Sequence, residues 1–403
     1  MTDLTERLEE IRRAGLDRRL RSVDGPQGPR VVLDGAEVLL LCSNNYLGLA
    51  DHPRVRQAAA EAAERYGAGA GGSRLISGNM SLHEKLERRL AEFEGAAAAL
   101  LFGSGYLANL GTIAALAGRG EVVFSDELNH ASIIDGCRLS RAETFVYRHR
   151  DVEHLAWGLA QAGERAALIV TDGVFSMDGD AAPLPELVEL ARRHRCRLCV
   201  DEAHGTGAIG PGGRGAVAAA GLDGEVDVIV GTLGKALGSY GAYVCAEDEV
   251  IDLLVNAARP FIFSTAPPPP AVGAALASLA LLESQPGLVE QLQRNAATLR
   301  GVLADHGLDT GPSRTQIVPV IVGDARRAIS LCERSLEGGV FAQAIRPPTV
   351  PDGTSRLRLS VMANHRADEL HAAAGVVAAA ARELGILDPA RPAGAVERLR
   401  PAA

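Results

Sequence analysis

Short apolar runs alternate with helical patterns from about residue 96 to about residue 246, and this alternation restricts the fold more than any other feature of the sequence. The runs that predict strands lie within residues 96–105, 121–126, 143–147, 166–176, 197–204, 226–232 and 241–246. Helical patterns, such as residues 184–195, separate several of them. Strands that are covered by helices on both faces read as continuous apolar segments. The pattern therefore predicts an α/β fold with a mostly parallel sheet between helices.

The chain on either side of this region has a different pattern. Residues 1–48 predict a helix, with Leu4, Leu8 and Ile11 on one face, followed by a β-hairpin over residues 30–43. After about residue 290, strand-like segments at 316–323 and 355–361 lie between helical patterns, which predicts a smaller α+β domain. We therefore divide the chain into residues 1–48, a large domain over 49–288, the α+β domain over 289–387 and a loose tail over 388–403.

Composition and charge disfavour several classes of function. The formal net charge of the 403 residues is −9, which argues against a broad surface for nucleic acid or anionic membranes. No run of about twenty apolar residues indicates a membrane span, and the charged N-terminal stretch lacks the apolar core of a signal peptide. Six cysteines are too few for a disulfide framework in a chain of this length. We expect a soluble, cytoplasmic protein with neither nucleic acid nor a membrane as a partner.

The sequence also contains a C-x-x-C pattern, formed by Cys196 and Cys199. A structural zinc site would need a second Cys/His pair at compatible spacing, and the sequence offers none. A redox role rests on equally weak support, because a lone C-x-x-C is a common coincidence. Both cysteines are better interpreted as small apolar residues that enter a buried strand, so no metal site is predicted.

Lys235 is the one charged residue in the segment VGTLGKALGSYGAYV, residues 230–244. Four glycines surround it, and no acidic residue lies within five positions on either side. An ammonium group that is removed from water without a counter-charge has a lowered pKa, and its amine becomes a usable nucleophile. Lys235 is therefore a candidate catalytic residue.

Polar side chains follow three consecutive predicted strands. Ser176 ends the first, Asp201 and His204 follow the second, and Thr232 and Lys235 follow the third. Each of them alone would be explained as a cap or as an ordinary hydrogen-bonded polar residue. Because ligands of open α/β sheets bind at the carboxyl ends of the strands, the set together predicts one shared pocket.

Pyridoxal 5′-phosphate (PLP) is the cofactor that suits this set of residues. A carboxylate such as Asp201, near a histidine such as His204, keeps the ring nitrogen protonated, and the ring then accepts electrons. The glycine-rich segment GSGYLAN, residues 103–109, precedes a predicted helix whose free N–H groups suit a phosphate. His130 follows another predicted strand, where a flat ring is placed to stack on the cofactor. The residues thus predict covalent cofactor chemistry at Lys235.

A competing motif is GTGAIG, residues 205–210, which matches the G-x-G-x-x-G pattern of nicotinamide-dependent dehydrogenases. That motif requires a helix that opens at its third glycine. Here Pro211, Gly212 and Gly213 follow at once, and they do not continue a regular helix. The sequence therefore disfavours nicotinamide binding.

The sequence resembles the α-oxoamine synthase family of fold-type I PLP enzymes over about residues 15–385. Six segments carry the resemblance: SNNYLGL (43–49), GAGAGGSRLISGN (67–79), LNHASIIDG (128–136), TDGVFSMDGD (171–180), VDEAHGTGAIG (200–210) and GTLGKALG (231–238). The segments are long and jointly specific. The resemblance implies a large domain with a mostly parallel seven-stranded sheet between helices, together with a smaller α+β domain.

The resemblance also implies roles for the residues at the strand ends. Lys235 would bind the cofactor aldehyde covalently and then transfer the substrate proton, while Asp201 would pair with the ring nitrogen. His204 and Ser176 would contact the ring hydroxyl, and His130 would stack on the ring.

Further residues would hold the cofactor phosphate, by the same resemblance. Gly105, Tyr106 and Thr232 would do so within one chain. Ser264 and Thr265, in the segment FIFSTAPP, would reach the phosphate from the neighbouring subunit. The enzyme implied by the resemblance is a homodimer with shared active sites.

Substrate contacts implied by the resemblance lie toward both ends of the chain. Arg358 would bind the substrate carboxylate, since a guanidinium donates two parallel hydrogen bonds to such a group. Asn44 would help to hold the bound intermediate, and His130 would also be among the substrate-binding residues. Arg18 and Thr349 would contact the acyl substrate.

Family members join an amino acid to an acyl thioester with loss of carbon dioxide. Residues 344–360 and the arginine-rich run 16–21 most resemble members that make a biotin precursor from L-alanine and a pimeloyl thioester, carried on coenzyme A or an acyl carrier protein. Three alternatives stay open: a member that uses glycine and acetyl-CoA, a nicotinamide-dependent dehydrogenase, and a non-catalytic partner subunit. The intact lysine, aspartate and histidine weigh against the last of these.

Overall fold

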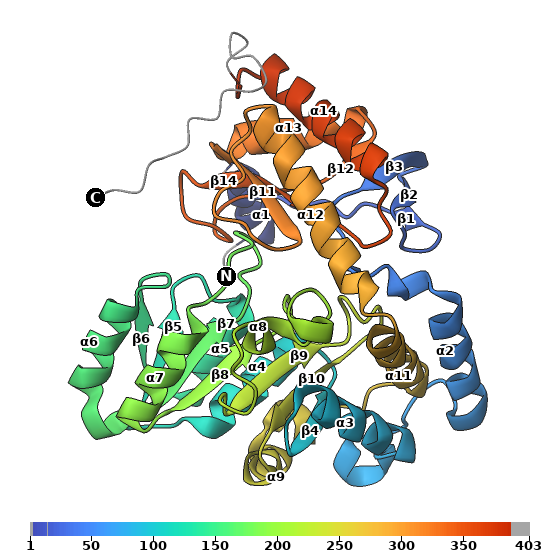
Figure 1. Ribbon diagram of the computed structural model, residues 1–403. Coiled ribbons are helices and arrows are strands. Elements are labelled where there is room, and N and C mark those ends of the chain that lie inside the picture. The colour runs from blue at the N-terminus through green and yellow to red at the C-terminus, as the bar shows by residue number, and fades with distance from the viewer. Residues whose placement is uncertain (1–2, 14, 388–403) are drawn as a thin grey trace.

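The computed structural model describes residues 3–13 and 15–387 (Figure 1), so the predicted tail over residues 388–403 lies outside the described residues. Its largest sheet has seven strands in the order β4-β10-β9-β8-β7-β5-β6. These strands are β4 Ala98–Phe102, β5 Val122–Asp126, β6 Glu143–Tyr147, β7 Ala166–Asp172, β8 Arg197–Asp201, β9 Val228–Thr232 and β10 Ala242–Ala246. Neighbours from β6 to β9 pair in parallel, whereas β10 pairs antiparallel with both β9 and β4. The predicted seven-stranded, mostly parallel sheet is confirmed.

The large sheet is buried on both faces except at its edge strand β6, where Val146 is 54% exposed. Side chains along a strand point alternately to opposite faces, and in β7 Leu168 and Val170 pack into one hydrophobic cluster while Ile169 packs into another. The first cluster includes side chains of α4 Gly105–Leu116, α5 Ala131–Ser140, α9 Asp248–Ala257 and α10 Arg259–Ile262. The second includes side chains of α3 Ser81–Glu94, α6 Val152–Ala162, α7 Leu184–His194, α8 Gly215–Ala219 and α11 Pro269–Ser284. Because helices cover both faces, a ligand reaches the sheet at the ends of its strands.

Two small sheets lie beyond one end of the large sheet (Figure 1). One has the order β11-β14-β13 and consists of β11 Ile317–Gly323, β13 Gln343–Ile345 and β14 Ser355–Ser360. The other has the order β1-β2-β3-β12 and consists of β1 Val23–Asp24, β2 Arg30–Leu33, β3 Ala36–Leu40 and β12 Val340–Phe341. The helices near them are α12 Gly287–Asp305, α13 Ala325–Glu337 and α14 Ala367–Glu383. The α+β arrangement predicted after residue 290 is present.

The predicted hairpin forms as β2 and β3, which Asp34 and Gly35 connect. Both turn residues have positive φ, 49° and 89°, which is the backbone that an Asp-Gly hairpin turn favours. β3 then pairs in parallel with β12, with Val340 opposite Leu39. The N-terminal hairpin therefore shares a sheet with a strand from the C-terminal region.

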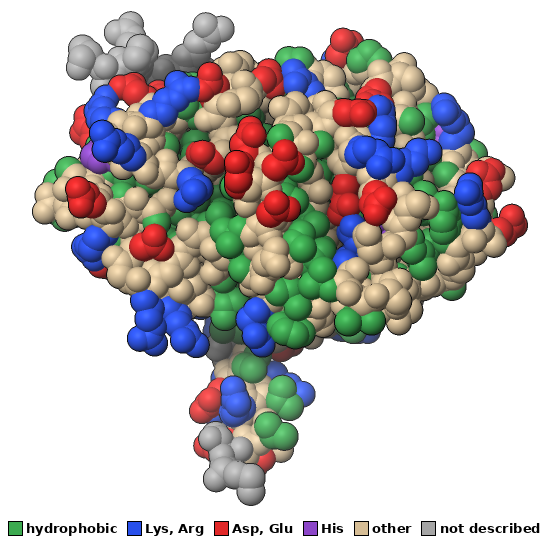
Figure 2. Space-filling model, turned by 90° about the horizontal axis from the view of Figure 1, so that it is seen from below, with side chains coloured by type: hydrophobic (Ala, Val, Ile, Leu, Met, Phe, Trp, Pro, Cys, Tyr) green, Lys and Arg blue, Asp and Glu red, His purple; other side chains and the backbone are tan. Residues whose placement is uncertain are grey.

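Two N-terminal helices differ in how they pack. α2 Pro53–Tyr66 packs against α11. α1 Leu4–Arg13 is the helix that the sequence predicts, yet it buries none of its residues, and the side chain of Leu4 is 73% exposed. Figure 2 shows α1 as a lobe that projects from the body of the molecule. The apolar face of α1 therefore has no partner surface within the described part of its own chain.

The helices α11 and α12 follow the predicted interruption at residues 266–270. Their axes are bent by 82° relative to each other. In the part of the chain that the structure describes, no single helix is long and apolar enough to cross a membrane, although this bent pair meets both criteria together. Within α11, Val272, Leu279 and Leu282 are buried in the core.

Candidate active site

Lys235 lies in the turn between β9 and β10, at the carboxyl ends of the parallel strands. The turn packs closely against the preceding loop, since a Cβ at Gly238 would lie 2.4 Å from the backbone nitrogen of Ala50. The Lys235 side chain is half-buried, and its Nζ lies 2.8 Å from Nε2 of His204. The turn therefore directs the amine toward the residues that follow β8.

His204 connects Lys235 to Tyr46. Its Nδ1 lies 2.6 Å from the hydroxyl oxygen of Tyr46, which is fully buried. Burial, together with the Lys235 charge, holds the pKa of His204 well below its usual range, so the ring is neutral. A neutral ring that accepts a hydrogen bond from the Lys235 ammonium at Nε2 donates from Nδ1 to Tyr46. The Tyr46 hydroxyl in turn donates to Oδ1 of Asn44 at 3.1 Å.

Asp201, at the end of β8, is buried and accepts two hydrogen bonds. The side-chain amide of Asn109 donates to its Oδ2 at 2.6 Å, and the N–H of Ala203 donates to its Oδ1 at 2.8 Å. The same Asn109 amide donates to Oγ of Ser132 at 2.9 Å, and this oxygen lies 2.7 Å from Nδ1 of His130. Asn109 and Ser132 thus connect the two predicted cofactor residues Asp201 and His130.

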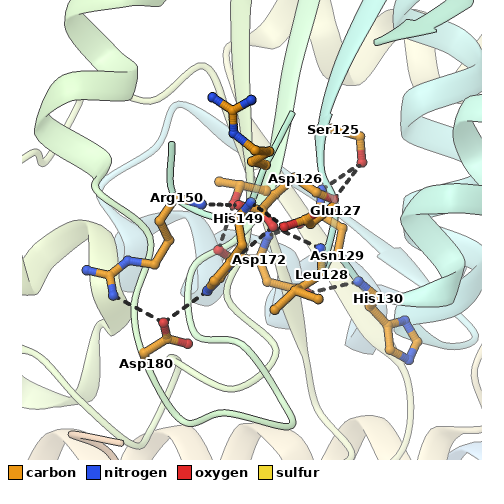
Figure 3. Close-up of polar contacts among 12 residues, drawn as sticks. Ser125, Asp126, Glu127, Leu128, Asn129, His130, His149, Arg150, Asp172 and Asp180 are labelled. Atoms are coloured by element: carbon orange, nitrogen blue, oxygen red, sulfur yellow. Dashed lines mark hydrogen bonds and ion pairs between the residues drawn. The ribbon is translucent and has the colours of Figure 1, made fainter. Parts of the chain in front are cut away.

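A second buried carboxyl group, Asp172, ends the neighbouring strand β7. It lies opposite Asp201 in the parallel pairing of β7 and β8, and it accepts the N–H of His130 at 2.9 Å (Figure 3). Burial and the charge of Asp201 raise the pKa of Asp172 well above its ordinary value. Burial lowers the pKa of Lys235 to about 8, although the charges of Asp201 and Asp172 oppose this shift. The amine therefore has acidic neighbours and is still easier to deprotonate than an ordinary lysine.

The start of α4, directly after β4, is suited to bind an anion. Ser104 caps the helix, because its Oγ accepts the N–H of Leu107 at 3.3 Å. The N–H groups of Gly105 and Tyr106, in the first turn, point out of the helix and need partners beyond it. A Cβ at Gly105 would meet no atom within 4 Å, so the space beside this turn is open. The predicted phosphate residues Gly105 and Tyr106 thus lie in the exposed first turn of α4, beside open space.

Arg358 and Ser176 meet where the loop after β7 contacts β14. The Nε of Arg358 donates to the carbonyl oxygen of Ser176 at 2.6 Å. Its Nη2 lies 3.3 Å from Oδ1 of Asn44 and 3.4 Å from the Tyr46 oxygen. Arg358 is only 6% exposed, and these three partners are neutral. The guanidinium charge is therefore left for an anionic ligand.

Thr232, Ser264 and Thr265 do not join this hydrogen-bonded cluster. The hydroxyl of Thr232 bonds within its own turn and donates to the carbonyl oxygen of Gly241 at 3.1 Å. Thr265 forms an antiparallel bridge with Ser73, and Ser264 precedes it. None of the three hydroxyls bonds to Lys235, His204 or Asp201 in the described structure.

Arg18 and Thr349 come from distant segments that the structure brings together. The guanidinium of Arg346 donates to the carbonyl oxygen of Asp17 at 2.7 Å. The carbonyl oxygen of Arg346 accepts the N–H of Thr349 at 3.1 Å. The side chains of Arg18 and Thr349 are both exposed. The predicted acyl contacts therefore share one exposed region near the end of β13.

Sequence reasoning missed four residues of the cluster, namely Tyr46, Asn109, Ser132 and Asp172. The strand-end argument that identified Asp201 applies equally to Asp172, because the two residues end neighbouring strands. Asn109 and Ser132 lie within segments that already pointed to a cofactor. Tyr46 also lies within a segment that carries the resemblance, SNNYLGL, but its contact with His204, 158 positions away, does not follow from that segment.

The two motifs considered as alternatives have structural explanations. In GTGAIG, Gly205 allows close approach to the buried Glu202, since a Cβ at this position would lie 1.7 Å from Oε2 of that carboxylate. Where a nucleotide-binding helix would open, the chain forms a short turn, Pro211–Gly213. Cys196 and Cys199 pack into hydrophobic clusters on opposite faces of the large sheet, so they do not form a pair of metal ligands.

Comparisons with known proteins agree on one family. A family model described as aminotransferase class I and II matches residues 36–377. The chain is 55% identical over 383 residues to the 8-amino-7-oxononanoate synthase of Geobacter sulfurreducens, and the match covers 94% of this chain and 98% of the relative. It is 36% identical to a solved serine palmitoyltransferase of S. paucimobilis with bound PLP and myriocin, at a TM-score of 0.90, covering 95% of this chain and 98% of that one.

A second solved structure, the 8-amino-7-oxononanoate synthase of Francisella tularensis, is 28% identical to this chain at a TM-score of 0.75. The match covers 86% of this chain and 98% of that one. These matches extend over the large sheet and both small sheets, so the predicted fold-type I architecture is confirmed. The chain therefore belongs to the aminotransferase class I and II family and, within it, to the α-oxoamine synthases.

Proposed function

We propose that this chain is an 8-amino-7-oxononanoate synthase that uses PLP to condense L-alanine with a pimeloyl thioester. The new bond joins Cα of alanine to the thioester carbonyl carbon, and the thiol and carbon dioxide leave. The observation that carries the proposal is the half-buried Lys235 amine, 2.8 Å from a neutral His204. It occurs in a chain that is 55% identical, over nearly its whole length, to a relative with this name.

The chemistry of the residues present suits PLP. Lys235, with a pKa of about 8, holds about one tenth of its amine in the neutral form at pH 7. The buried Asp201 carboxylate is held by two neutral N–H donors, which leaves its charge for a protonated ring nitrogen. The open first turn of α4, at Gly105, suits the phosphate. When bound, PLP supplies the sink for the electron pair that stays on alanine Cα after proton loss.

Each residue of the cluster has a task in this proposal. Lys235 binds the cofactor aldehyde and then moves the proton at alanine Cα. Arg358 binds the alanine carboxylate through its guanidinium, and Asn44, which contacts Arg358, orients the same group. Asp201 would hold the proton at the ring nitrogen, and His130 would stack on the ring.

The outer parts of the site would hold the ends of the ligands. Gly105 and Tyr106 would donate backbone N–H groups to the phosphate, with Thr232 nearby. Arg18 and Thr349 would contact the acyl group from the region that Arg346 holds together. His204, which also contacts Lys235, and Ser176 would both contact the hydroxyl group of the cofactor ring.

We further propose a homodimer with shared active sites, in which Ser264 and Thr265 reach the phosphate of the neighbouring subunit. Apolar side chains near the bridge between Ser73 and Thr265 support this, because Ile76 and Phe263 are 83% and 70% exposed. Figure 2 shows hydrophobic side chains gathered between charged ones on one face of the molecule. Analytical ultracentrifugation should give a dimer mass, and Thr265→Ala should weaken PLP binding; a monomer at micromolar concentration would contradict the proposal.

A panel of amino acids and acyl donors tests the proposed function. Purified holoenzyme is incubated with alanine, glycine or serine, and with pimeloyl or acetyl groups on coenzyme A or an acyl carrier protein. We expect mass spectrometry to detect 8-amino-7-oxononanoate from alanine and a pimeloyl donor. Product formed only from glycine and acetyl-CoA would identify a different member of the family, and a protein that binds no PLP would overturn the proposal altogether.

A further inference from the structure

A second network of buried charges lies beside the site and has no part in the proposed chemistry. It is centred on His149, whose two ring nitrogens contact two different carboxylates (Figure 3). Nδ1 lies 2.9 Å from Oδ1 of Asp126, and Nε2 lies 3.0 Å from Oδ2 of Asp180. The two carboxylate side chains are 1% and 4% exposed. A ring that donates to both carboxylates carries a proton on each nitrogen, so the bridge is cationic.

The surroundings of His149 favour this cationic form. Burial lowers the pKa of His149, but the hydrogen bonds and charges of Asp126 and Asp180 outweigh it and raise the pKa to about 9. Arg150 brings a second cation, with Nη1 at 3.2 Å from Oδ2 of Asp180, and its N–H donates to Asp126 at 2.9 Å. The carboxylate of Glu127 accepts the backbone N–H of His149 at 2.8 Å.

Asp126 ends β5 and shapes the turn that leads to His130. Its Oδ1 accepts the N–H of Leu128 at 2.9 Å, and its carbonyl oxygen accepts the N–H of Asn129 at 3.2 Å. The next N–H, that of His130, donates to Asp172 at 2.9 Å. The position of His130 therefore depends on where Asp126 holds the start of this turn.

Asp180 lies at the far end of the loop that carries Ser176. Its carbonyl oxygen accepts the N–H of Phe175 at 2.9 Å, and the Phe175 ring meets the His149 ring at 89° with centroids 4.4 Å apart. The carbonyl oxygen of the next residue, Ser176, accepts the Nε–H of Arg358 at 2.6 Å. A shift of Asp180 would therefore move the group that orients Arg358.

We propose that His149 is a positioning residue that holds the loop bearing His130 and the loop bearing Ser176 together and thereby fixes the direction of Arg358. It acts through the two carboxylates and not by contact with the reacting groups. The proposal rests on the proposed function in one respect, since Arg358 is there the ligand of the alanine carboxylate.

The variant His149→Gln tests this role. A glutamine amide keeps a donor for one carboxylate but loses the second hydrogen bond and the charge. We expect the KM for alanine to rise about tenfold or more, and kcat per PLP-containing site to fall as well, because the loop that bears His130 also loses its support. Loss of folded protein alone would lower the number of sites and leave KM unchanged. The matched control is His371→Gln, which changes an exposed histidine on α14 and should leave both values unaltered.

The single variant Asp180→Asn tests the same bridge if His149→Gln gives little folded protein, and the double variant tests the coupling of the two residues if both single variants fold. Asp180→Asn removes one charge of the bridge and keeps the side-chain shape. It should raise the alanine KM by a comparable factor, and the double variant should raise it no further than the larger single change. Independent effects that multiply in the double variant would overturn the proposal.

Amide hydrogen exchange of the apo-enzyme gives a reading that does not depend on activity. Peptides that cover residues 127–130 and 173–181 should exchange faster in His149→Gln, while peptides of α14 should exchange as in the wild type. Unchanged exchange in both loops would overturn the positioning role. Failure of the wild-type enzyme in the substrate panel would overturn only the proposed function, because exchange reports on the loops whatever the reaction.

Discussion

The Nζ of Lys235 lies 2.8 Å from Nε2 of His204, 31 positions earlier in the chain. A neutral imidazole accepts a hydrogen bond from the ammonium without adding charge, whereas a carboxylate in its place would raise the pKa of the amine. The contact therefore fixes the side chain while burial lowers the pKa of Lys235 to about 8. A lysine held in this way is both well placed and reactive.

Reduction with borohydride should attach PLP to Lys235 and leave Lys85 unlabelled. These are the two lysines of the sequence, and Lys85 is exposed on α3, which makes it a matched control. Peptide mass spectrometry should find about one label per chain, on the Lys235 peptide. Lys235→Ala should lose the label and turnover, while Lys85→Ala should keep both. Turnover that persists in Lys235→Ala would refute the assignment.

The rate of PLP attachment to the apo-enzyme should rise with pH and level off between about pH 8 and 9. Only the neutral amine attacks the aldehyde, and below the pKa its fraction grows about tenfold per pH unit. Because the pKa of Lys235 is lowered to about 8, this growth ends early, whereas an ordinary lysine gains neutral amine up to about pH 10.4. Stopped-flow absorbance between pH 6 and 10 measures the profile, and a rate that still climbs at pH 10 would contradict the lowered pKa.

Asn109→Ala should destabilise the protein and slow catalysis, because it removes the donor 2.6 Å from Oδ2 of Asp201. A lost hydrogen bond to a charged group costs about 1.5–3 kcal/mol, so the free energy of unfolding of the apo-enzyme in urea should fall by about that amount. The value of kcat/KM for alanine should fall about tenfold or more. Asn256→Ala removes an exposed amide donor on α9 and should change stability by less than about 0.5 kcal/mol. Equal losses in the two variants would contradict the importance of the Asp201 contact.

Most of the large sheet is predictable from the sequence because all of its strands except the edge strand β6 are buried on both faces. Residues 226–232 read as one apolar run, and β9 occupies Val228–Thr232 within it. Lys235 stands out for the same reason, since a single cation in a buried segment costs free energy and needs an explanation. The polar residues at the strand ends come together because parallel strands place their carboxyl ends at one edge.

Contacts between distant segments leave no pattern in the sequence that is comparable to these apolar runs. Tyr46 reaches His204, and His149 bridges Asp126 and Asp180, yet a tyrosine or a histidine in a loop has many ordinary environments. The helix α1 shows another limit, because its amphipathic pattern predicts a helix but not the surface on which that helix packs. These features depend on how the chain folds back on itself, and local sequence pattern carries no information about that.

Glu94→Gln should reduce the pH dependence of stability. Glu94 is buried, and its Oε1 accepts the hydroxyl of Tyr243 at 2.5 Å. Burial raises the pKa of Glu94 to about 8 from an ordinary value of 4.5. Between these pH values the folded chain binds more protons than the unfolded chain, so the free energy of unfolding decreases as the pH rises toward 8. Glutamine has the shape of the protonated carboxyl group, keeps the acceptor for Tyr243, and does not titrate.

Urea titrations of the apo-enzyme between pH 5 and 8.5 should therefore give a smaller decrease in the free energy of unfolding for Glu94→Gln than for the wild type. Glu202, whose pKa burial raises to about 7, contributes its own decrease, so the slope should shrink without vanishing. Glu92→Gln is the matched control, because Glu92 lies on the same helix, α3, with its side chain 62% exposed, and this variant should keep the wild-type slope. If Glu94→Gln and Glu92→Gln have the same pH slope, Glu94 is ionised in the folded protein and the explanation from burial is wrong.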